Sequence, residues 1–210
     1  MIDTILAEIP DEIETRFNDV VADPEGRVFC GTMPTNARPG RLYRFNLDGS
    51  YDVIVEGIGC PNGMGFTVDL KQMYFTDSTE HVIWICAYDR TSGSLGDRRE
   101  FARTEPPVMP DGLTVDADGN IWSAQWNGAR VVCYSQNGQT RHEIELPTSR
   151  ITSLVFGGPD FEDLYVTSAS DDEKTTEQQP LAGSLFRIRN CSKGQPEFVS
   201  RIGLADRPLE

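Results

Sequence analysis

The sequence predicts an all-β fold of the β-propeller class, and three observations support that prediction. Helical periodicity is nearly absent, and short apolar runs alternate instead with turns rich in Gly, Asp, Asn and Pro. The chain also contains four related repeats. Each repeat holds about four strand-like runs within about 45 residues, which is the make-up of one propeller blade.

The repeats align on one polar residue each, namely Asn18, Asn62, Asp111 and Thr152. After that residue come a strand, a tight turn and a second strand that carries an aromatic residue. These first halves span, in order, 16–33, 60–78, 109–126 and 151–169. A second pair of strands is expected after each half, at 40–58, 81–103, 129–147 and 183–202.

No domain boundary is evident along the chain. We expect residues 1–210 to form a single β-propeller domain from which the N-terminal blade or blades are missing. Residues 1–15 are interpreted as the last strand of an earlier blade or a remnant of one. Residues 171–180, "DDEKTTEQQP", are interpreted as a polar loop between strands of the last blade.

The composition excludes several classes of partner. The formal net charge is -14 and no basic patch stands out, so neither nucleic acid nor an anionic membrane is expected as a partner. No apolar run approaches the length needed to span a bilayer, and the acidic N-terminus does not resemble a signal peptide. Together these observations favour a cytoplasmic protein that binds a small molecule.

The five cysteines are odd in number and show no C-x-x-C spacing. We interpret them as small hydrophobic residues buried in strands, as expected in a reducing compartment. They are Cys30, Cys60, Cys86, Cys133 and Cys191.

The aligned polar residues of the repeats are the best candidates for a functional site. The first strand of each blade lines the central channel of a propeller, so Asn18, Asn62, Asp111 and Thr152 should converge on one mouth of that channel. A ring of amide and carboxylate oxygens suits a hard divalent cation. Such a cation polarises a carbonyl, and a carboxylate beside it activates water as a general base.

A purely structural interpretation of the same residues is also available. Asn62-Gly63 and Asp111-Gly112 are dipeptides typical of tight turns. Their position before the inner strand argues against that role, because the hairpins contain turn residues of their own, such as "DADG" at 116–119. We therefore interpret "DADG" as a hairpin turn and not as a calcium loop.

Other chemistries have little support in the sequence. The two histidines, His81 and His142, are expected on outer strands, so a histidine metal cluster is not predicted. No G-x-S-x-G elbow, P-loop or G-x-G-x-x-G motif is present. Trp122 and Trp126 are interpreted as packing between blades, with ligand stacking as the alternative.

Four segments of the chain resemble one family. The runs "RFNDVVADPEGRVFCGTM", "CPNGMGFTVDLKQMYFTDST", "PDGLTVDADGNIWSAQWNGARVV" and "ELPTSRITSLVFGGPDFEDLYVTSAS" occur in the order found in the SMP-30/gluconolactonase/luciferin-regenerating-enzyme family. The resemblance covers roughly residues 14–202. It implies a six-bladed propeller with one divalent metal in the channel and an activity that hydrolyses sugar lactones.

The resemblance also implies roles for individual residues. Asn62 of "PNG" corresponds to a metal-binding asparagine, and Asp111 of "PDG" to a metal-binding aspartate that is also the general base. Arg16 and Asn18 of "RFND" correspond to residues that hold the substrate, and Asp19 to a supporting residue. The resemblance therefore implies that the metal polarises the lactone carbonyl, while Asp111 or a metal-bound water supplies the nucleophile.

One ligand of the family pattern is missing. The family supplies a metal-binding glutamate from an N-terminal motif that is absent here, and Glu8, Glu12 and Glu14 lack its context. The chain enters the pattern part way along, so open blade edges are expected to favour self-association.

The sequence leaves the metal open among calcium, zinc, manganese and iron(II). It also leaves two rival functions. One is a catalytically impaired or non-catalytic propeller that binds small molecules or proteins. The other is an interaction propeller of the NHL or WD40 type.

Overall fold

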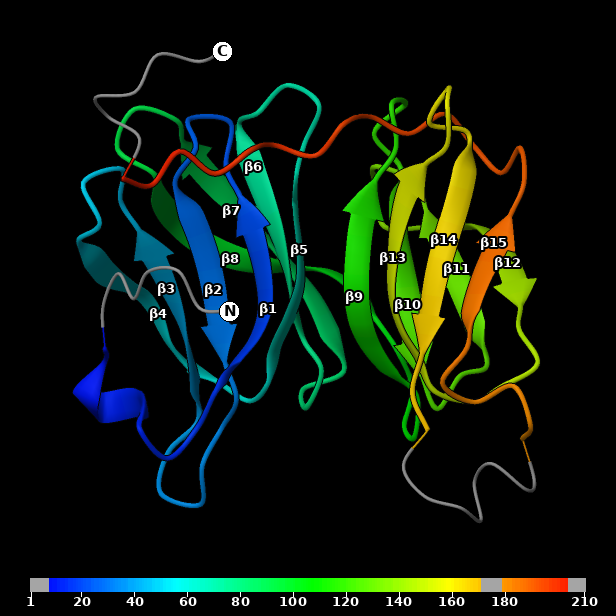
Figure 1. The fold of residues 1–210 in the computed structure, drawn as a ribbon, viewed down its shortest axis with the longest axis horizontal. Helices are drawn as coiled ribbons and strands as arrows, with labels where there is room; N and C mark the ends of the chain where they lie inside the picture. Colours follow the sequence, from blue (N-terminus) through cyan, green and yellow to red (C-terminus); the bar gives the residue numbers. More distant parts are fainter. Residues whose placement is uncertain (1–7, 171–178, 204–210) are drawn as a thin grey trace.

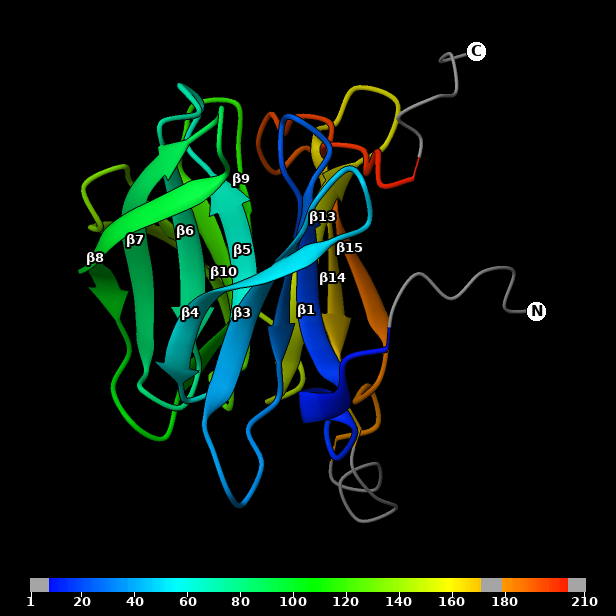
Figure 2. The ribbon, with the colours of Figure 1, turned by 90° about the vertical axis from the view of Figure 1, so that its left-hand side faces the viewer.

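The predicted β-propeller fold is confirmed. The computed structural model describes residues 8–170 and 179–203, and its strands form four antiparallel sheets stacked side by side as blades around one axis (Figures 1 and 2). Within each blade the strands follow one another in sequence order. The first strand of every blade lies nearest the axis, and the inner strands of consecutive blades contact one another.

The strand boundaries agree with most of the predicted repeats. Blade 1 contains β1 (Phe17–Ala22), β2 (Val28–Thr32), β3 (Gly40–Phe45) and β4 (Tyr51–Ile58). Blade 2 contains β5 (Pro61–Phe66), β6 (Gln72–Asp77), β7 (Val82–Asp89) and β8 (Ser94–Arg103). Blade 3 contains β9 (Met109–Val115), β10 (Ile121–Trp126), β11 (Arg130–Tyr134) and β12 (Thr140–Glu145). Blade 4 contains β13 (Ile151–Gly157), β14 (Asp163–Ser168) and β15 (Leu185–Ile188).

The core lies between neighbouring blades. A middle strand such as β7 is apolar along much of its length because a blade packs against each of its faces. Phe29 of blade 1 meets Phe66 of blade 2 edge to face, and Trp122 of blade 3 meets Phe156 of blade 4 in the same way. The outer strand β12 is instead almost entirely polar and exposed. The apolar layers therefore hold the blades in a fixed angular order around the channel.

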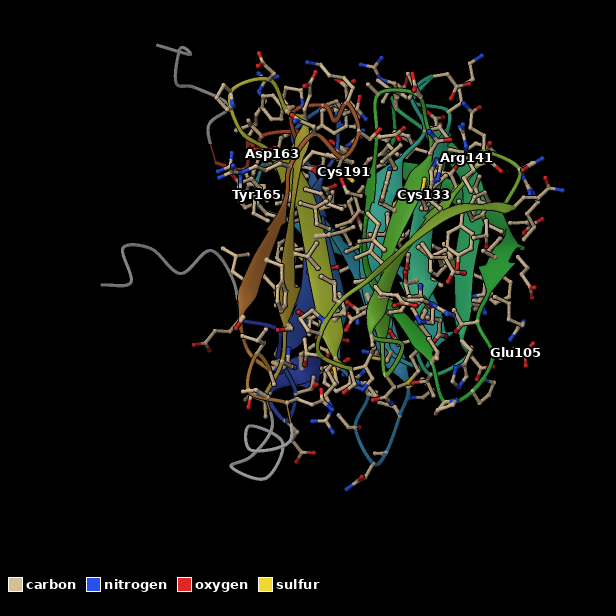
Figure 3. The ribbon with its side chains drawn as sticks, turned by 90° about the vertical axis from the view of Figure 1, so that its right-hand side faces the viewer. Glu105, Cys133, Arg141, Asp163, Tyr165 and Cys191 are labelled. Carbon is tan, nitrogen blue, oxygen red and sulfur yellow. The ribbon has the colours of Figure 1, made fainter. Side chains whose placement is uncertain are left out.

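Blade 4 differs from the prediction in its last strand. The sequence predicts two strands within 183–202, but this stretch forms only β15. Asn190 has a φ of 50°, which turns the chain out of the sheet, and its N–H donates to Asp163 at the start of β14. Cys191 follows this turn directly, and it lies near the same end of the blade as Asp163 (Figure 3).

Residues 191–203, here called the strap, leave blade 4 and cross one end of the propeller. In Figure 1 they form the orange-to-red segment along the top, above the inner strands. The Ala117 N–H of blade 3 donates to the Lys193 carbonyl, and the Arg201 N–H donates to the Gly26 carbonyl of blade 1. The strap therefore connects blades 3 and 4 to blade 1 at the end of the propeller that carries the β1–β2 and β9–β10 turns.

The prediction of a strand within residues 1–15 is wrong for the part that the structure describes. Residues Pro10–Glu12 form a 3₁₀ helix, η1. Pro10 lies in its first turn, where a backbone N–H would have no partner within the helix. The Glu12 carboxylate accepts a hydrogen bond from the Tyr43 hydroxyl and forms an ion pair with Arg38. This ionic contact fixes the segment on blade 1. Residues 1–7 lie outside the described residues, as does most of the predicted loop 171–180.

The "DADG" stretch is a hairpin turn, as predicted. The Gly119 N–H donates to the Asp116 carbonyl and Gly119 has a φ of 80°, which glycine adopts without strain. Among the described residues, no helix is long and apolar enough to cross a membrane.

The cysteine prediction holds for three of the five residues. Cys30, Cys86 and Cys133 are buried in strands, whereas Cys60 and Cys191 are partly exposed. None of the five forms a disulfide.

Candidate functional site

A β-bulge occurs near the start of all four inner strands, at the residue that aligns the repeats. The strand register shifts at Asn18-Asp19 in β1, next to Asn62 in β5, at Asp111 in β9 and at Thr152 in β13. A bulge inserts one extra residue and re-aims the side chains beside it. The structure therefore brings the four aligned residues to equivalent positions at one end of the channel.

The tight-turn interpretation of the two glycine pairs is wrong. Both pairs lie inside strands, and neither Gly63 nor Gly112 has a positive φ. A Cβ on Gly63 would lie 2.2 Å from the backbone nitrogen of Leu113, and one on Gly112 would lie 2.8 Å from the Cα of Ser153. Glycine is required because the inner strands of adjacent blades approach so closely.

A cavity of about 510 Å³ opens at this end of the channel, opposite the strap. All four aligned residues line it. Two further sets of equivalent positions complete most of the wall. The first set, two residues before the aligned residue, contains Arg16, Cys60 and Met109. The second set, where the second strand of each blade ends, contains Met33, Ser78 and Trp126.

Arg16 and Asn18 form one polar side of the cavity. Arg16 is exposed, and its Nη1 donates to Asn18 Oδ1 at 3.2 Å. Asn18 Nδ2 in turn donates to the Pro61 carbonyl of blade 2 at 3.0 Å. These contacts orient the asparagine amide and place a guanidinium group, which can bind hydroxyl or carbonyl oxygens, at the cavity edge.

Asn62 is held between blades 2 and 3. Its Nδ2 donates to Ser78 Oγ at 3.2 Å, and Ser78 Oγ donates to the Pro110 carbonyl at 2.6 Å. The Asn62 side chain also lowers the pKa of the neighbouring Asp111 carboxylate, against the effect of burial. Because the amide nitrogen is engaged in this way, Oδ1 is the atom of Asn62 that remains to accept a hydrogen bond or bind a cation.

Asp111 is the most strongly perturbed carboxylate of the cavity. Burial, and after it the negative charge of Asp19, raise its pKa to about 7, against the lowering effect of Asn62 and the Gly112 N–H. Burial also raises the pKa of Asp19. Among the described residues, neither carboxylate forms an ion pair. The cavity thus contains two carboxylates that form no ion pair with a described residue, although the Arg16 guanidinium lies at its edge.

Sequence reasoning underestimated part of this site. Asp19 was expected only to support its neighbours, yet its charge acts on Asp111 across the channel from blade 1 to blade 3. Trp126, expected as packing, lines the cavity instead, whereas Trp122 does pack between blades. Cys60 and Met109 begin their repeats, two residues before the aligned residue, so the repeat alignment already contained the signal for them.

The described part of the chain contains no group of three His, Cys, Asp or Glu side chains arranged to hold a metal. No glutamate within 8–170 or 179–203 lines the cavity, and Glu12 is engaged elsewhere by Tyr43. A cation here would therefore depend on amide as well as carboxylate oxygens.

Fold and site together define a propeller with one acidic cavity at the open end of its channel. Residues 2–170 match the model of the SMP-30/gluconolactonase/LRE-like family, and the chain belongs to that family.

Relatives and solved structures agree with this assignment. The pentonolactonase XacC of Haloferax volcanii is 45% identical over 197 residues, which cover 90% of this chain and 68% of the relative. Regucalcin of Danio rerio is 35% identical, with 93% of this chain and 69% of the relative covered. The structure of regucalcin from Agrobacterium tumefaciens, described as a calcium-binding protein, superposes with a TM-score of 0.88 at 29% identity, covering 95% of this chain and 70% of that one.

Proposed function

We propose that this chain hydrolyses sugar lactones, with Asp111 as general base and as ligand, together with Asn62, of a divalent metal ion. One observation carries the proposal: the half-buried carboxylate of Asp111, which forms no ion pair with any described residue, faces a cavity next to the oriented amide of Asn62. The similarity to a pentonolactonase supports a lactone as the substrate class.

The donor atoms of the cavity fit a hard cation. Asp111 offers a carboxylate, and Asn62 offers an amide oxygen whose nitrogen is already engaged by Ser78. Asp19 adds a second, half-buried carboxylate whose charge a cation would offset. Carboxylate and amide oxygens favour calcium or manganese over soft metals, and zinc and iron(II) also accept such ligands. When bound, the metal supplies Lewis-acid polarisation of the lactone carbonyl.

Arg16 and Asn18 have the chemistry needed to bind and orient the substrate. Arg16 presents N–H donors at the cavity edge, and Asn18 is fixed by its hydrogen bond to Pro61. Such donors would hold the ring hydroxyls so that the carbonyl carbon faces Asp111. Fixed orientation of this kind lowers the entropic part of the barrier.

The Asp111 carboxylate removes a proton from a water molecule while the oxygen of that water adds to the lactone carbonyl carbon. When the tetrahedral intermediate collapses, the ring C–O bond breaks. The proton held by Asp111 then passes to the ring oxygen, which leaves as a hydroxyl group. The product is an aldonic acid, and the carboxylate is restored.

The test is acid release from a panel of aldonolactones, followed after chelation and after addition of calcium, manganese, zinc or iron(II). We expect turnover that depends on one or more of these ions and that loses most of its rate when Arg16 is replaced by Met. If every lactone opens at the buffer rate under all of these conditions, the proposal is wrong and a binding role is the better interpretation.

A further inference from the structure

Trp126 is a large aromatic residue placed at the cavity wall and not in the core. It ends β10 and is half-buried, whereas Trp122 on the same strand is almost fully buried and packs against Phe156. Trp126 belongs to none of the three apolar clusters formed by the described residues. An exposed apolar side chain in a cavity is typical of a surface that contacts a ligand.

The cavity wall is uneven around the axis. At the end of the second strand, blades 1 to 4 carry Met33, Ser78, Trp126 and Ala169 in turn, as the strand registers show. A large apolar residue therefore stands on each side of the small Ser78, which holds Asn62. The cavity wall therefore combines apolar side chains, Met33 and Trp126, with the polar side chains of Asn62 and Asp111, a lining that suits a ring with apolar faces and polar edges.

The indole ring of Trp126 is contacted by Arg150, which immediately precedes the first strand of blade 4. The guanidinium of Arg150 lies 5.1 Å from the ring centroid, and the two residues also form an isolated β-bridge. A cation over one face of an indole is attracted by the ring quadrupole, which restricts rotation of the side chain. Trp126 is thus held in place before any ligand arrives, so little side-chain entropy is lost on binding.

We infer that Trp126 is a stacking residue that binds the C–H face of the lactone ring and selects cyclic substrates. The inference rests on the proposed function for the identity of the ligand. The ring carbons of a sugar lactone carry C–H groups on their faces and oxygens at their edges, which matches a cavity lined by Met33 and Trp126 as well as by Asn62 and Asp111. Aromatic contacts of this kind contribute about 0.5–1.5 kcal/mol, a factor of about two to ten in affinity.

Trp84 provides a matched control. It too is a half-buried indole with a guanidinium over its ring, that of Arg98 at 4.8 Å, but it lies on β7 and does not line the cavity. Replacing either tryptophan by leucine removes an indole stacked with an arginine. Only Trp126→Leu removes a surface that faces the cavity.

The kinetic test compares Trp126→Leu with Trp84→Leu on an aldonolactone and on the open-chain methyl ester of the same acid. For Trp126→Leu we expect KM for the lactone to rise about three- to tenfold with kcat changed less than about twofold. KM for the open-chain ester should change much less, so the preference for the ring falls. Equal KM changes in the two variants, or none, would overturn the inference.

A binding measurement keeps the inference separate from the proposed hydrolysis. An aldonolactam, the amide counterpart of the lactone, should shift the indole fluorescence of Trp84→Leu, which retains Trp126, and leave that of Trp126→Leu unchanged. This result would support stacking even if the parent opened no lactone. No fluorescence change in Trp84→Leu at millimolar lactam would overturn it.

Discussion

Two aspartates at the two ends of β9 show how one residue type serves two purposes. Asp116, next to the strap, is fully buried and accepts hydrogen bonds from the Asn120 backbone N–H at 2.8 Å, the Trp122 indole at 3.0 Å and the Ser192 hydroxyl at 3.1 Å. Asp111, at the cavity, is near a second carboxylate, and burial raises its pKa to about 7.

The difference lies in what surrounds each carboxylate. Donors from the turn, from β10 and from the strap converge on Asp116, so its charge stabilises the structure. Asp111 is supported by the Asn62 amide and the Gly112 N–H, which do not offset burial and the charge of Asp19. A buried charge left under-compensated is typical of a binding or catalytic site, and a compensated one of a structural element.

The largest expected effect is on catalysis, through Asp111→Asn. Loss of the general base should lower kcat/KM for lactones about 10³- to 10⁴-fold, because an amide cannot accept the proton. The folded state should keep its stability at pH 7, since the buried charge disappears. Asp118→Asn, an exposed position in the β9–β10 turn, serves as the control and should retain activity. Activity of Asp111→Asn equal to that of this control would contradict the comparison.

Asp116, at the other end of β9, is expected to affect stability where Asp111 affects catalysis. Asp116→Ala leaves several buried donors without an acceptor and should lower the free energy of unfolding by about 3–5 kcal/mol, measured by urea denaturation. Asp69→Ala changes an exposed turn aspartate of blade 2 and should cost less than about 1 kcal/mol. A loss for Asp116→Ala as small as that for Asp69→Ala would show that the donors find other partners.

The pH dependence of stability should report directly on the raised pKa of Asp111. In chelated protein the folded state holds a proton on Asp111 up to about pH 7, whereas an unfolded chain releases it near pH 3.8. The folded state therefore binds more protons between these values, and the free energy of unfolding contributed by Asp111 falls as pH rises from 4 to 7. The difference between the parent and Asp111→Asn should change by about 2–4 kcal/mol over this range.

Addition of a divalent cation at pH 7 extends the same test. Binding to the folded state should raise the melting temperature of the parent but not that of Asp111→Asn. If the free energy of unfolding varies with pH in the same way in the parent and in Asp111→Asn, the folded state ionises the Asp111 carboxylate as easily as the unfolded chain does.

Much of this contrast was predictable from the sequence, because the repeat itself encodes it. Aligning Asn62 with Asp111 placed both at one end of the channel, and the recurrence of turn residues identified Asp116 as part of a hairpin. The influence of Asp19 on Asp111 was not predictable, since it acts between blades 1 and 3 across the channel. Repeat alignment gives equivalent positions in different blades but not the distances between them.

The strap was missed for a different physical reason. Residues near Phe198 have the apolar character of a strand, and strand propensity does not show which partner completes the backbone hydrogen bonds. Here those partners are loops of other blades, such as Gly26, which accepts from Arg201. Trp126 was misjudged similarly, because an indole at the end of a strand has the same local pattern whether it faces a core or a cavity.

The smallest expected effect tests whether close blade packing holds the cavity end in register. Gly63→Ala places a Cβ 2.6 Å from the Asp111 carbonyl and 2.2 Å from the Leu113 nitrogen, so β9 must shift. We expect a loss of about 1–3 kcal/mol in the free energy of unfolding and a further loss of kcat, because Asp111 moves with the strand.

Gly49→Ala is the control: Gly49 lies in the β3–β4 turn at a φ of 86° with no atom within 4 Å of the added carbon. It should cost about 1 kcal/mol through backbone strain alone and leave kcat unchanged. If both variants lose stability but neither loses kcat, the position of Asp111 does not depend on the contact between β5 and β9.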